Sequence, residues 1–95
     1  MFVVLLEFSD NREAAPQHMA GHKAWLDRGF EAGTFLLAGS LRPEAGGGIL
    51  ADNVSRAELE ALVAEDPFVA EDVVRPSIHE IAPARADERL AFLAA

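Results

Sequence analysis

The chain has 95 residues, of which 51% are hydrophobic and 25% are charged, a composition typical of one compact globular domain. The 16 acidic residues outnumber the 8 basic ones, which gives a formal net charge of −8. The basic residues are scattered along the chain, so nucleic acid and anionic membranes are disfavoured as partners. The chain contains no cysteine, which excludes disulfides, thiolate nucleophiles and cysteine-ligated metals.

The apolar start of the chain does not resemble a targeting segment. Residues 2–6 have no basic segment before them and no small-residue cleavage site after them, and the acidic Glu7 follows at once. The apolar run is also far too short to span a bilayer. We therefore expect a soluble cytoplasmic protein.

Two elements are predicted in the first third of the chain. Residues 2–8 are β-branched and aromatic and predict a strand, and because both of its faces are apolar we expect it in the centre of a sheet. Residues 16–32 predict a helix, since Pro16 suits the first turn and Gly33 the position after the last one. The apolar stripe of this helix is expected to consist of Ala15, Met19, His22, Leu26 and Gly29, with Trp25 and Phe30 beside it.

The middle of the chain predicts two strands that are joined by a long loop. Residues 34–38 are the second strand, residues 39–47 are the loop, and residues 48–51 are a short third strand. The run Gly46-Gly47-Gly48 lacks the lysine and the following helix of a phosphate-binding loop. We interpret it as a flexible turn. In the functional interpretation, this turn is a lid over a pocket.

The last third of the domain predicts a helix and a strand. Ser55 and Glu58 match the capping-box pattern that begins a helix. The helix should end at Asp66, because a residue before proline avoids the helical region. Residues 73–82 predict the last strand, and Pro76 within it cannot donate to a ladder, which favours an edge position.

The order β-α-β-β-α-β predicts an α+β fold, the ferredoxin-like split βαβ, with a four-stranded antiparallel sheet. Right-handed crossovers place the first and third strands in the middle and both helices on one face. The other face would be apolar and bare in a monomer, so we expect a homodimer formed through the sheets. Residues 1–82 form the domain, and residues 83–95 form a tail, expected as a short helix docked on the domain or on the dimer partner.

Two residues are candidates for acid–base chemistry. His22 lies on an apolar helix stripe, where it is either a core-edge histidine with one hydrogen bond or a general acid or base. Asp66 is either an ordinary turn residue before proline or a carboxylate that orients His22 and favours its protonated form. The two helices of a split βαβ fold run side by side, so a pair of His22 with Asp66 is geometrically reasonable.

Other polar residues have weaker functional interpretations. His18 and His22 are four residues apart, a metal-ligand spacing, but the chain has no H-E-x-x-H motif and we interpret His18 as a solvated residue of the first turn. Ser40 is either a turn hydroxyl or a hydrogen-bond donor to a substrate, and it is a weak nucleophile because no G-x-S-x-G motif surrounds it. His79 is interpreted as structural. We expect no metal and no cofactor.

The combination of motifs has a family counterpart. In order, the chain has an apolar first strand, His22 and Gly33, Phe35-Leu36-Leu37-Ala38-Gly39, a Gly-Gly turn, Ser55 and Asp66-Pro67-Phe68. With this order and spacing it resembles the YciI-like family over residues 1–82. The resemblance implies a ferredoxin-like fold that dimerises through its sheets, with a His–Asp dyad in an active-site cleft. The dyad maps onto His22 and Asp66.

The chain departs from the family pattern in two places. It has Gly39-Ser40 where the family often has Gly-Pro, and the segment after Phe68 lacks a frequent glycine. Both departures concern the shape and chemistry of the pocket more than the fold. The tail after Ala82 has no assigned counterpart in the family.

Two functions agree with these observations. The first is a small cofactor-independent enzyme that performs elimination, isomerisation or a related proton transfer on a small metabolite. His22 would move the proton, Asp66 would orient His22, and Ser40 would assist substrate binding. The alternative is a non-catalytic dimeric module that binds a small molecule or has an accessory role. The sequence identifies neither the substrate nor the reaction type.

Overall fold

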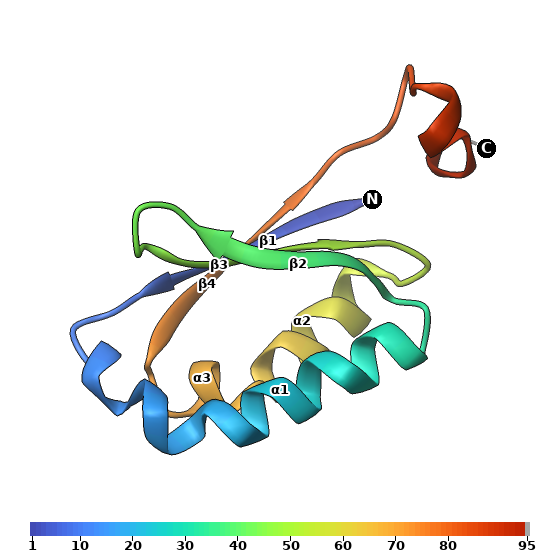
Figure 1. Cartoon of the computed structure of the whole chain (residues 1–95). Helices are drawn as coiled ribbons and strands as arrows, with labels where there is room; N and C mark the ends of the chain where they lie inside the picture. The colour runs from blue at the N-terminus through green and yellow to red at the C-terminus, as the bar shows by residue number, and fades with distance from the viewer. Residues whose placement is uncertain (95) are drawn as a thin grey trace.

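The computed structural model describes residues 1–94, which form one small domain followed by a projecting tail (Figure 1). The domain alternates strands and helices in the order that the sequence predicts. Its elements are β1 (Phe2–Phe8), α1 (Ala15–Glu31), β2 (Phe35–Leu41), β3 (Gly46–Ala51), α2 (Arg56–Ala64), α3 (Pro67–Ala70) and β4 (Val74–Glu80), with 3₁₀ turns η1 (Arg12–Ala14) and η2 (Glu88–Leu93).

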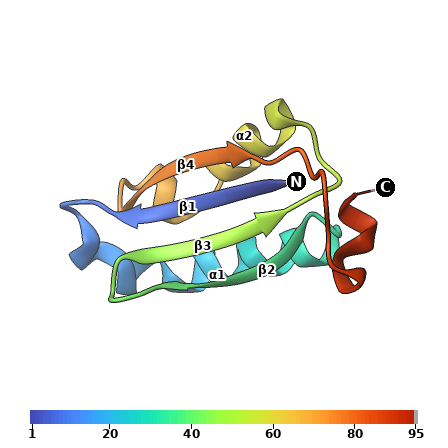
Figure 2. The same cartoon turned by 90° about the horizontal axis from the view of Figure 1, so that it is seen from above.

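The four strands form one antiparallel sheet in the order β2-β3-β1-β4. Both longer helices lie on the same face of this sheet, and within residues 1–94 no α-helix packs on the opposite face (Figures 1 and 2). Pro76 lies in the edge strand β4, where its missing N–H removes no ladder bond that the sheet needs. The predicted α+β, ferredoxin-like fold is therefore confirmed, including the central position of β1.

Strand β1 has apolar residues on both of its faces, as expected of a central strand. Phe2, Val4 and Leu6 point to the helices and are 4%, 0% and 2% exposed, respectively. The intervening residues Val3 and Leu5 point to the bare face and are half-buried. Because side chains alternate across a strand, one apolar heptapeptide serves two faces of the sheet.

Burial on α1 differs from the predicted stripe. Trp25 and Gly29 are buried, whereas Met19 is 38% exposed. A Cβ on Gly29 would lie 2.1 Å from the Phe35 ring, so glycine allows α1 to approach the sheet closely there. The helix therefore packs on the sheet through Trp25 and Gly29, and Met19 lies beside open space at the other end.

The ends of the second helical segment follow the predicted capping pattern. The Ser55 side chain accepts a bond from the Glu58 backbone, and the Glu58 carboxylate accepts one from the Ser55 backbone. Helix α2 ends at Ala64, and the chain turns before Pro67 begins the single turn of α3. Asp66 is the N-cap residue of that turn. The expected helix end at Asp66-Pro67 is thus confirmed.

The glycine run differs from its prediction. Gly46, Gly47 and Gly48 are not a flexible turn or a lid, because they belong to β3 and pair with β1 on one side and β2 on the other. The turn lies earlier, at residues 42–45. A side chain at Gly46, which has a φ of 131°, would meet the Leu6 carbonyl at 2.0 Å. Glycine is therefore required at position 46, whereas a Cβ at Gly47 or Gly48 would make contacts of 3.4 Å or more.

The C-terminal tail leaves the end of β4 and stands clear of the domain, on the side of the sheet away from the helices (Figure 1). Its 3₁₀ turn has Asp87 as its N-cap residue. Leu90 is 48% exposed and Phe92 is 57% exposed in the single chain. Docking of this tail on a partner subunit remains a prediction. Within residues 1–94, no helix is long and apolar enough to cross a membrane.

Candidate active site

The structure brings the two predicted acid–base residues together. His22 comes from the middle of α1 and Asp66 from the N-cap of α3. The Nδ1 atom of His22 lies 2.8 Å from Oδ1 of Asp66, which is hydrogen-bond distance. Asp66 is fully buried, and the His22 side chain is 14% exposed. A buried carboxylate therefore holds an imidazole that reaches the surface of a pocket.

Asp66 is held in place by the local fold of the chain. Its Oδ1 also accepts a bond of 3.0 Å from the backbone N–H of Phe68, the usual contact of an N-cap carboxylate. Its other oxygen, Oδ2, is buried and has no hydrogen-bond partner within residues 1–94. The carboxylate thus has few donors, and His22 is the one side chain among them. This favours a strong, oriented bond to the imidazole.

Aromatic packing fixes the plane of the His22 ring. The Phe68 ring stacks on it in parallel, with centroids 4.1 Å apart and an interplanar angle of 4°. Trp25 lies on the same helix with its ring centroid 5.9 Å from that of His22, and its indole N–H donates to the Leu62 carbonyl. With the ring plane and Nδ1 both held, the imidazole has little rotational freedom.

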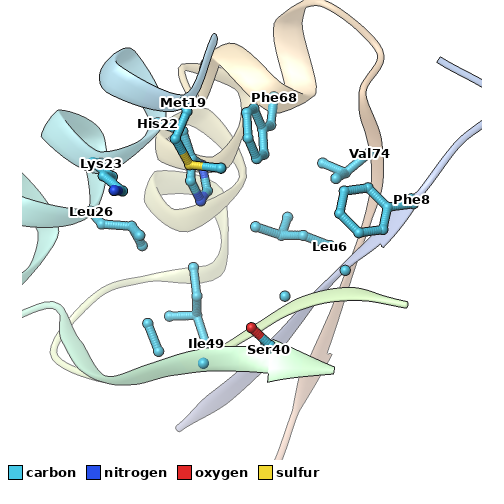
Figure 3. A pocket seen from close by; sticks show the side chains of 15 residues that line it. Leu6, Phe8, Met19, His22, Lys23, Leu26, Ser40, Ile49, Phe68 and Val74 are labelled. Atoms are coloured by element: carbon cyan, nitrogen blue, oxygen red, sulfur yellow. The ribbon is translucent and has the colours of Figure 1, made fainter. Parts of the chain in front are cut away.

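The hydrogen bond to Asp66 also assigns the tautomer of neutral His22. A carboxylate only accepts, so Nδ1 carries the proton and donates it to Oδ1. The Nε2 atom then has a free lone pair, and it makes no hydrogen bond within residues 1–94. Figure 3 shows the His22 side chain pointing into the pocket. The residue is arranged to accept a proton from a bound molecule.

The pocket lies between α1, α3 and the sheet and has a volume of about 320 Å³. Met19, His22, Leu26 and Phe68 line its helical side (Figure 3). On the sheet side the lining includes Leu6, Phe8, Ile49 and the glycines of β3. The walls are largely apolar, and this volume suits a small organic molecule.

Ser40 lies across the pocket from His22, at the end of β2 (Figure 3). It is exposed, and it belongs to a strand instead of the turn that the sequence predicts. Pairing with Gly47 places it on the helix-covered face. Its hydroxyl is thus within the pocket lining, as its predicted binding role requires.

Two histidines do not belong to the site. His18 is half-buried and does not line the pocket. His79 is exposed and pairs with Val3, which places it on the bare face. No group of three potential metal-ligating side chains occurs within residues 1–94. The His18–His22 spacing therefore does not extend to a cluster of ligands.

Sequence reasoning missed Lys23 and Gly47 as pocket residues. Lys23 follows His22 directly and gives no periodic signal of its own. Gly47 has a signal in hindsight, because glycines inside a strand often mark a close approach of a ligand or of another backbone. This inference requires that residues 46–48 are already known to form a strand.

The topology and the pocket define the class of protein: a small α+β domain with split βαβ order and a buried His–Asp pair beside a cavity. A family model described as the YCII-related domain matches residues 1–81, and the chain belongs to this family. The resemblance seen in the sequence is confirmed by this match. No curated protein matches the chain significantly.

A solved structure shares the fold. It is 5-chloro-2-hydroxyhydroquinone dehydrochlorinase (TftG) from Burkholderia phenoliruptrix AC1100, in complex with 2,5-dihydroxybenzoquinone. The TM-score is 0.68 and the sequences are 14% identical, with 85% of this chain and 93% of that chain covered. At this identity the likeness supports the fold.

Proposed function

We propose that this protein is a small cofactor-independent enzyme in which His22 and Asp66 act as a general acid–base dyad on a small metabolite. The observation that carries the proposal is the 2.8 Å contact between His22 Nδ1 and Asp66 at the wall of the pocket. It leaves Nε2 free on the pocket side. A histidine poised this way is the usual choice for proton transfer near neutral pH.

The proposed reaction begins when Nε2 of His22 removes a proton from a carbon or from a hydroxyl group of the substrate. The two electrons of that C–H or O–H bond form a new double bond or an enolate. In an elimination, the leaving group departs with its bonding electrons from a tetrahedral carbon conjugated to the new double bond. For a chlorinated hydroxyhydroquinone, the proton of one hydroxyl first moves to the carbon that bears chlorine, which gives a ring ketone; loss of a second hydroxyl proton then expels chloride and leaves a hydroxyquinone. In an isomerisation, His22 returns the proton to a different atom of the same molecule.

Asp66 supports both directions of this proton transfer. Its negative charge stabilises the imidazolium that forms when His22 takes the proton, and its bond to Nδ1 keeps Nε2 directed at the substrate. Its burial keeps water from competing for that bond. Ser40 donates a hydrogen bond to a polar substituent of the substrate from the opposite wall.

The shape of the pocket favours a compact, planar substrate. Phe68 and Leu26 offer flat or apolar contacts on one side, and the glycines of β3 leave space on the other. The dehydrochlorinase of similar fold acts on a chlorinated hydroxyhydroquinone, according to its name. Elimination from a small oxygenated ring is therefore the first reaction to test.

The test uses 5-chloro-2-hydroxyhydroquinone with chloride release as the readout. In parallel, a panel of small ring ketones in deuterated water is screened by NMR for exchange of C–H protons. We expect His22→Asn to lower the rate of either reaction by about 10²–10⁴-fold. Asp66→Asn should act in the same direction, while an amide still caps α3. The control is His18→Asn, on the same helix but outside the pocket lining.

Circular dichroism and thermal melting establish that the variants are folded. Full activity of His22→Asn, or equal losses for His22→Asn and His18→Asn, would contradict the proposal. A bound ligand that exchanges no proton and loses no leaving group would favour the alternative, a non-catalytic binding module. The cytoplasmic location remains a prediction, and these assays do not test it.

A further inference from the structure

The charges around the pocket differ from those of the rest of the molecule. The chain has a net charge of −8, but no carboxylate of residues 1–94 lines the pocket. Lys23 is the charged side chain among the lining residues, and the other ionisable or hydroxyl-bearing members are His22 and Ser40. A pocket in an acidic protein is thus bordered by a cation next to its candidate base.

Lys23 is available to bind a ligand. Within residues 1–94 it makes no ion pair and no side-chain hydrogen bond. By contrast, Arg56 pairs with Glu60 one turn away, and Arg12 donates to the Glu44 carbonyl. Lys23 is exposed and lines the pocket, so the three donors of its ammonium group can reach a ligand.

Helix geometry places Lys23 one residue after the candidate base, with both side chains in the lining of the same pocket. Met19 and Lys23 are four residues apart and share a face of α1, and His22 precedes Lys23 by about 100° of rotation. All three side chains line the pocket (Figure 3). A ligand that presents a C–H bond to His22 therefore has its neighbouring substituent within reach of the flexible Lys23 stem.

We propose that the pocket selects an organic anion: a planar, conjugated molecule whose ionised oxygen, a carboxylate or an enolate, pairs with the Lys23 ammonium. This proposal rests on the proposed function, because it assigns the substrate class of the same site. The apolar ring of the ligand lies between Phe68 and the glycines of β3, and its acidic carbon faces His22. When His22 removes the proton, charge that develops on the oxygen is stabilised by Lys23.

The local cation matters because the rest of the protein opposes an anion. The long-range field of a chain with a net charge of −8 repels a negative ligand, although salt screens it beyond about 10 Å. A charge-assisted hydrogen bond at a partly exposed rim is expected to change affinity by about tenfold. Lys23 should therefore decide whether the pocket prefers an anion or its neutral analogue.

The experiment compares benzoate with benzamide, which have the same shape and different charge. Binding is followed by an NMR titration of backbone amides, and shifts should be confined to pocket residues such as Leu6 and Gly47. We expect the protein to bind benzoate about tenfold more tightly than benzamide. Lys23→Met, which keeps the stem and removes the charge, should abolish this preference by weakening benzoate binding more than benzamide binding.

Two further variants sharpen the result. Lys23→Arg should retain the preference for benzoate. Arg28→Met, which removes a positive charge from the same helix outside the pocket lining, should also retain it. The proposal is wrong if Lys23→Met keeps the benzoate preference, if the unmodified protein prefers benzamide, or if neither compound shifts the pocket amides at millimolar concentration.

The assay separates this inference from the proposed function. His22→Asn should lose turnover but still prefer benzoate to benzamide, because the ammonium of Lys23 is intact. If Lys23→Met loses the preference while His22→Asn keeps full turnover, the anion site stands and the dyad mechanism fails. If Lys23→Met keeps the preference for benzoate while His22→Asn loses turnover, the dyad mechanism stands and the anion site is wrong.

Discussion

Both faces of the sheet carry apolar side chains of β1, but their surroundings differ. On the helix-covered face, the β1 residues Phe2, Val4 and Leu6 are almost fully buried. On the bare face, the neighbouring Leu5 is only half-buried, and Leu37 of β2 is 55% exposed. One strand thus supplies apolar side chains to a finished core and to a surface that nothing in the single chain covers.

The comparison shows that apolar pattern and burial are separate properties. The pattern makes β1 central, but the helices decide which face becomes the core. On the covered face, large residues fill the space under α2, and small ones such as Ala38 and Gly47 leave the pocket under the start of α1. Within residues 1–94, neither α1 nor α2 packs on the bare face, so association with another copy is its expected use.

The largest effect is expected from a charge on the bare face. The homodimer through this face is a prediction, and Leu5→Glu should break it by burying an uncompensated carboxylate against the partner's apolar surface. We expect the dimer to weaken by at least about a hundredfold. Light scattering coupled to size-exclusion chromatography measures the mass of each species.

The matched control is Ala61→Glu, which adds the same charge to the exposed side of α2. It should leave the association state unchanged. An unmodified protein that is monomeric at all concentrations would contradict the prediction. So would a Leu5→Glu variant that dimerises as tightly as the unmodified protein.

A middle-sized effect is expected from filling the pocket. Gly47 pairs with Leu6 and with Ser40, both of which line the pocket, so a side chain at this position points into it. A Cβ would meet its first neighbour, the Gly39 carbonyl, at 3.4 Å, which a small shift accommodates. Gly47→Val should keep the fold and weaken benzoate binding by about tenfold or more, as measured in the same NMR titration.

Gly48→Val is its control on the other face of the same strand. Gly48 pairs with Leu5, and a Cβ there would lie 3.5 Å from the Leu41 side chain. Although its backbone borders the pocket, its side chain would point to the bare face. The variant should retain ligand binding. Equal effects of the two valines would show that the pocket does not have the geometry described.

The smallest effect is expected far from both faces, at the start of α2. Ser55→Ala removes the N-cap bond to the Glu58 backbone and should lower the free energy of unfolding by about 1 kcal/mol. Urea denaturation measures this change. Activity and association should not change, because Ser55 belongs to neither the pocket nor the bare face. A loss of ligand binding in this variant would contradict that separation.

The capping box also predicts a pH dependence. The backbone N–H of Ser55, followed by its side chain, holds the pKa of Glu58 below its ordinary value of 4.5. Because the folded-state pKa is lower than the unfolded one, the contribution of Glu58 to stability is present above about pH 4.5 and is lost as pH falls through the folded pKa. The stability difference between the unmodified protein and Glu58→Gln, measured by urea denaturation, should therefore narrow in acid.

The sequence was most informative where local rules agree with the tertiary structure. The bounds of β1, the cap at Ser55 and the edge position of Pro76 follow from alternation, capping chemistry and the missing N–H of proline. It was misleading at Gly46, because a glycine run is usually a turn. Here the run is a strand, since two neighbouring strands pair with it, and only Gly46 has no room for a side chain.

The candidate site was partly predictable. His22 and Asp66 could be selected as polar residues at unusual places, and the family resemblance paired them. Their distance, the stacking of Phe68 on His22 and the unpaired Oδ2 of Asp66 depend on how α1 crosses α3. Lys23 could not be selected, because a lysine on a helix gives no signal until the neighbouring space is known.

By itself, the sequence determined the order of elements, the central first strand and the capped second helix, because these depend on contacts between residues that are near in the chain. The tertiary structure alone decided which face of the sheet is covered and that Trp25, not Met19, anchors α1. It alone brought an imidazole, a buried carboxylate and a lysine to one cavity. These properties come from packing between distant segments, and no local pattern records the space left between them.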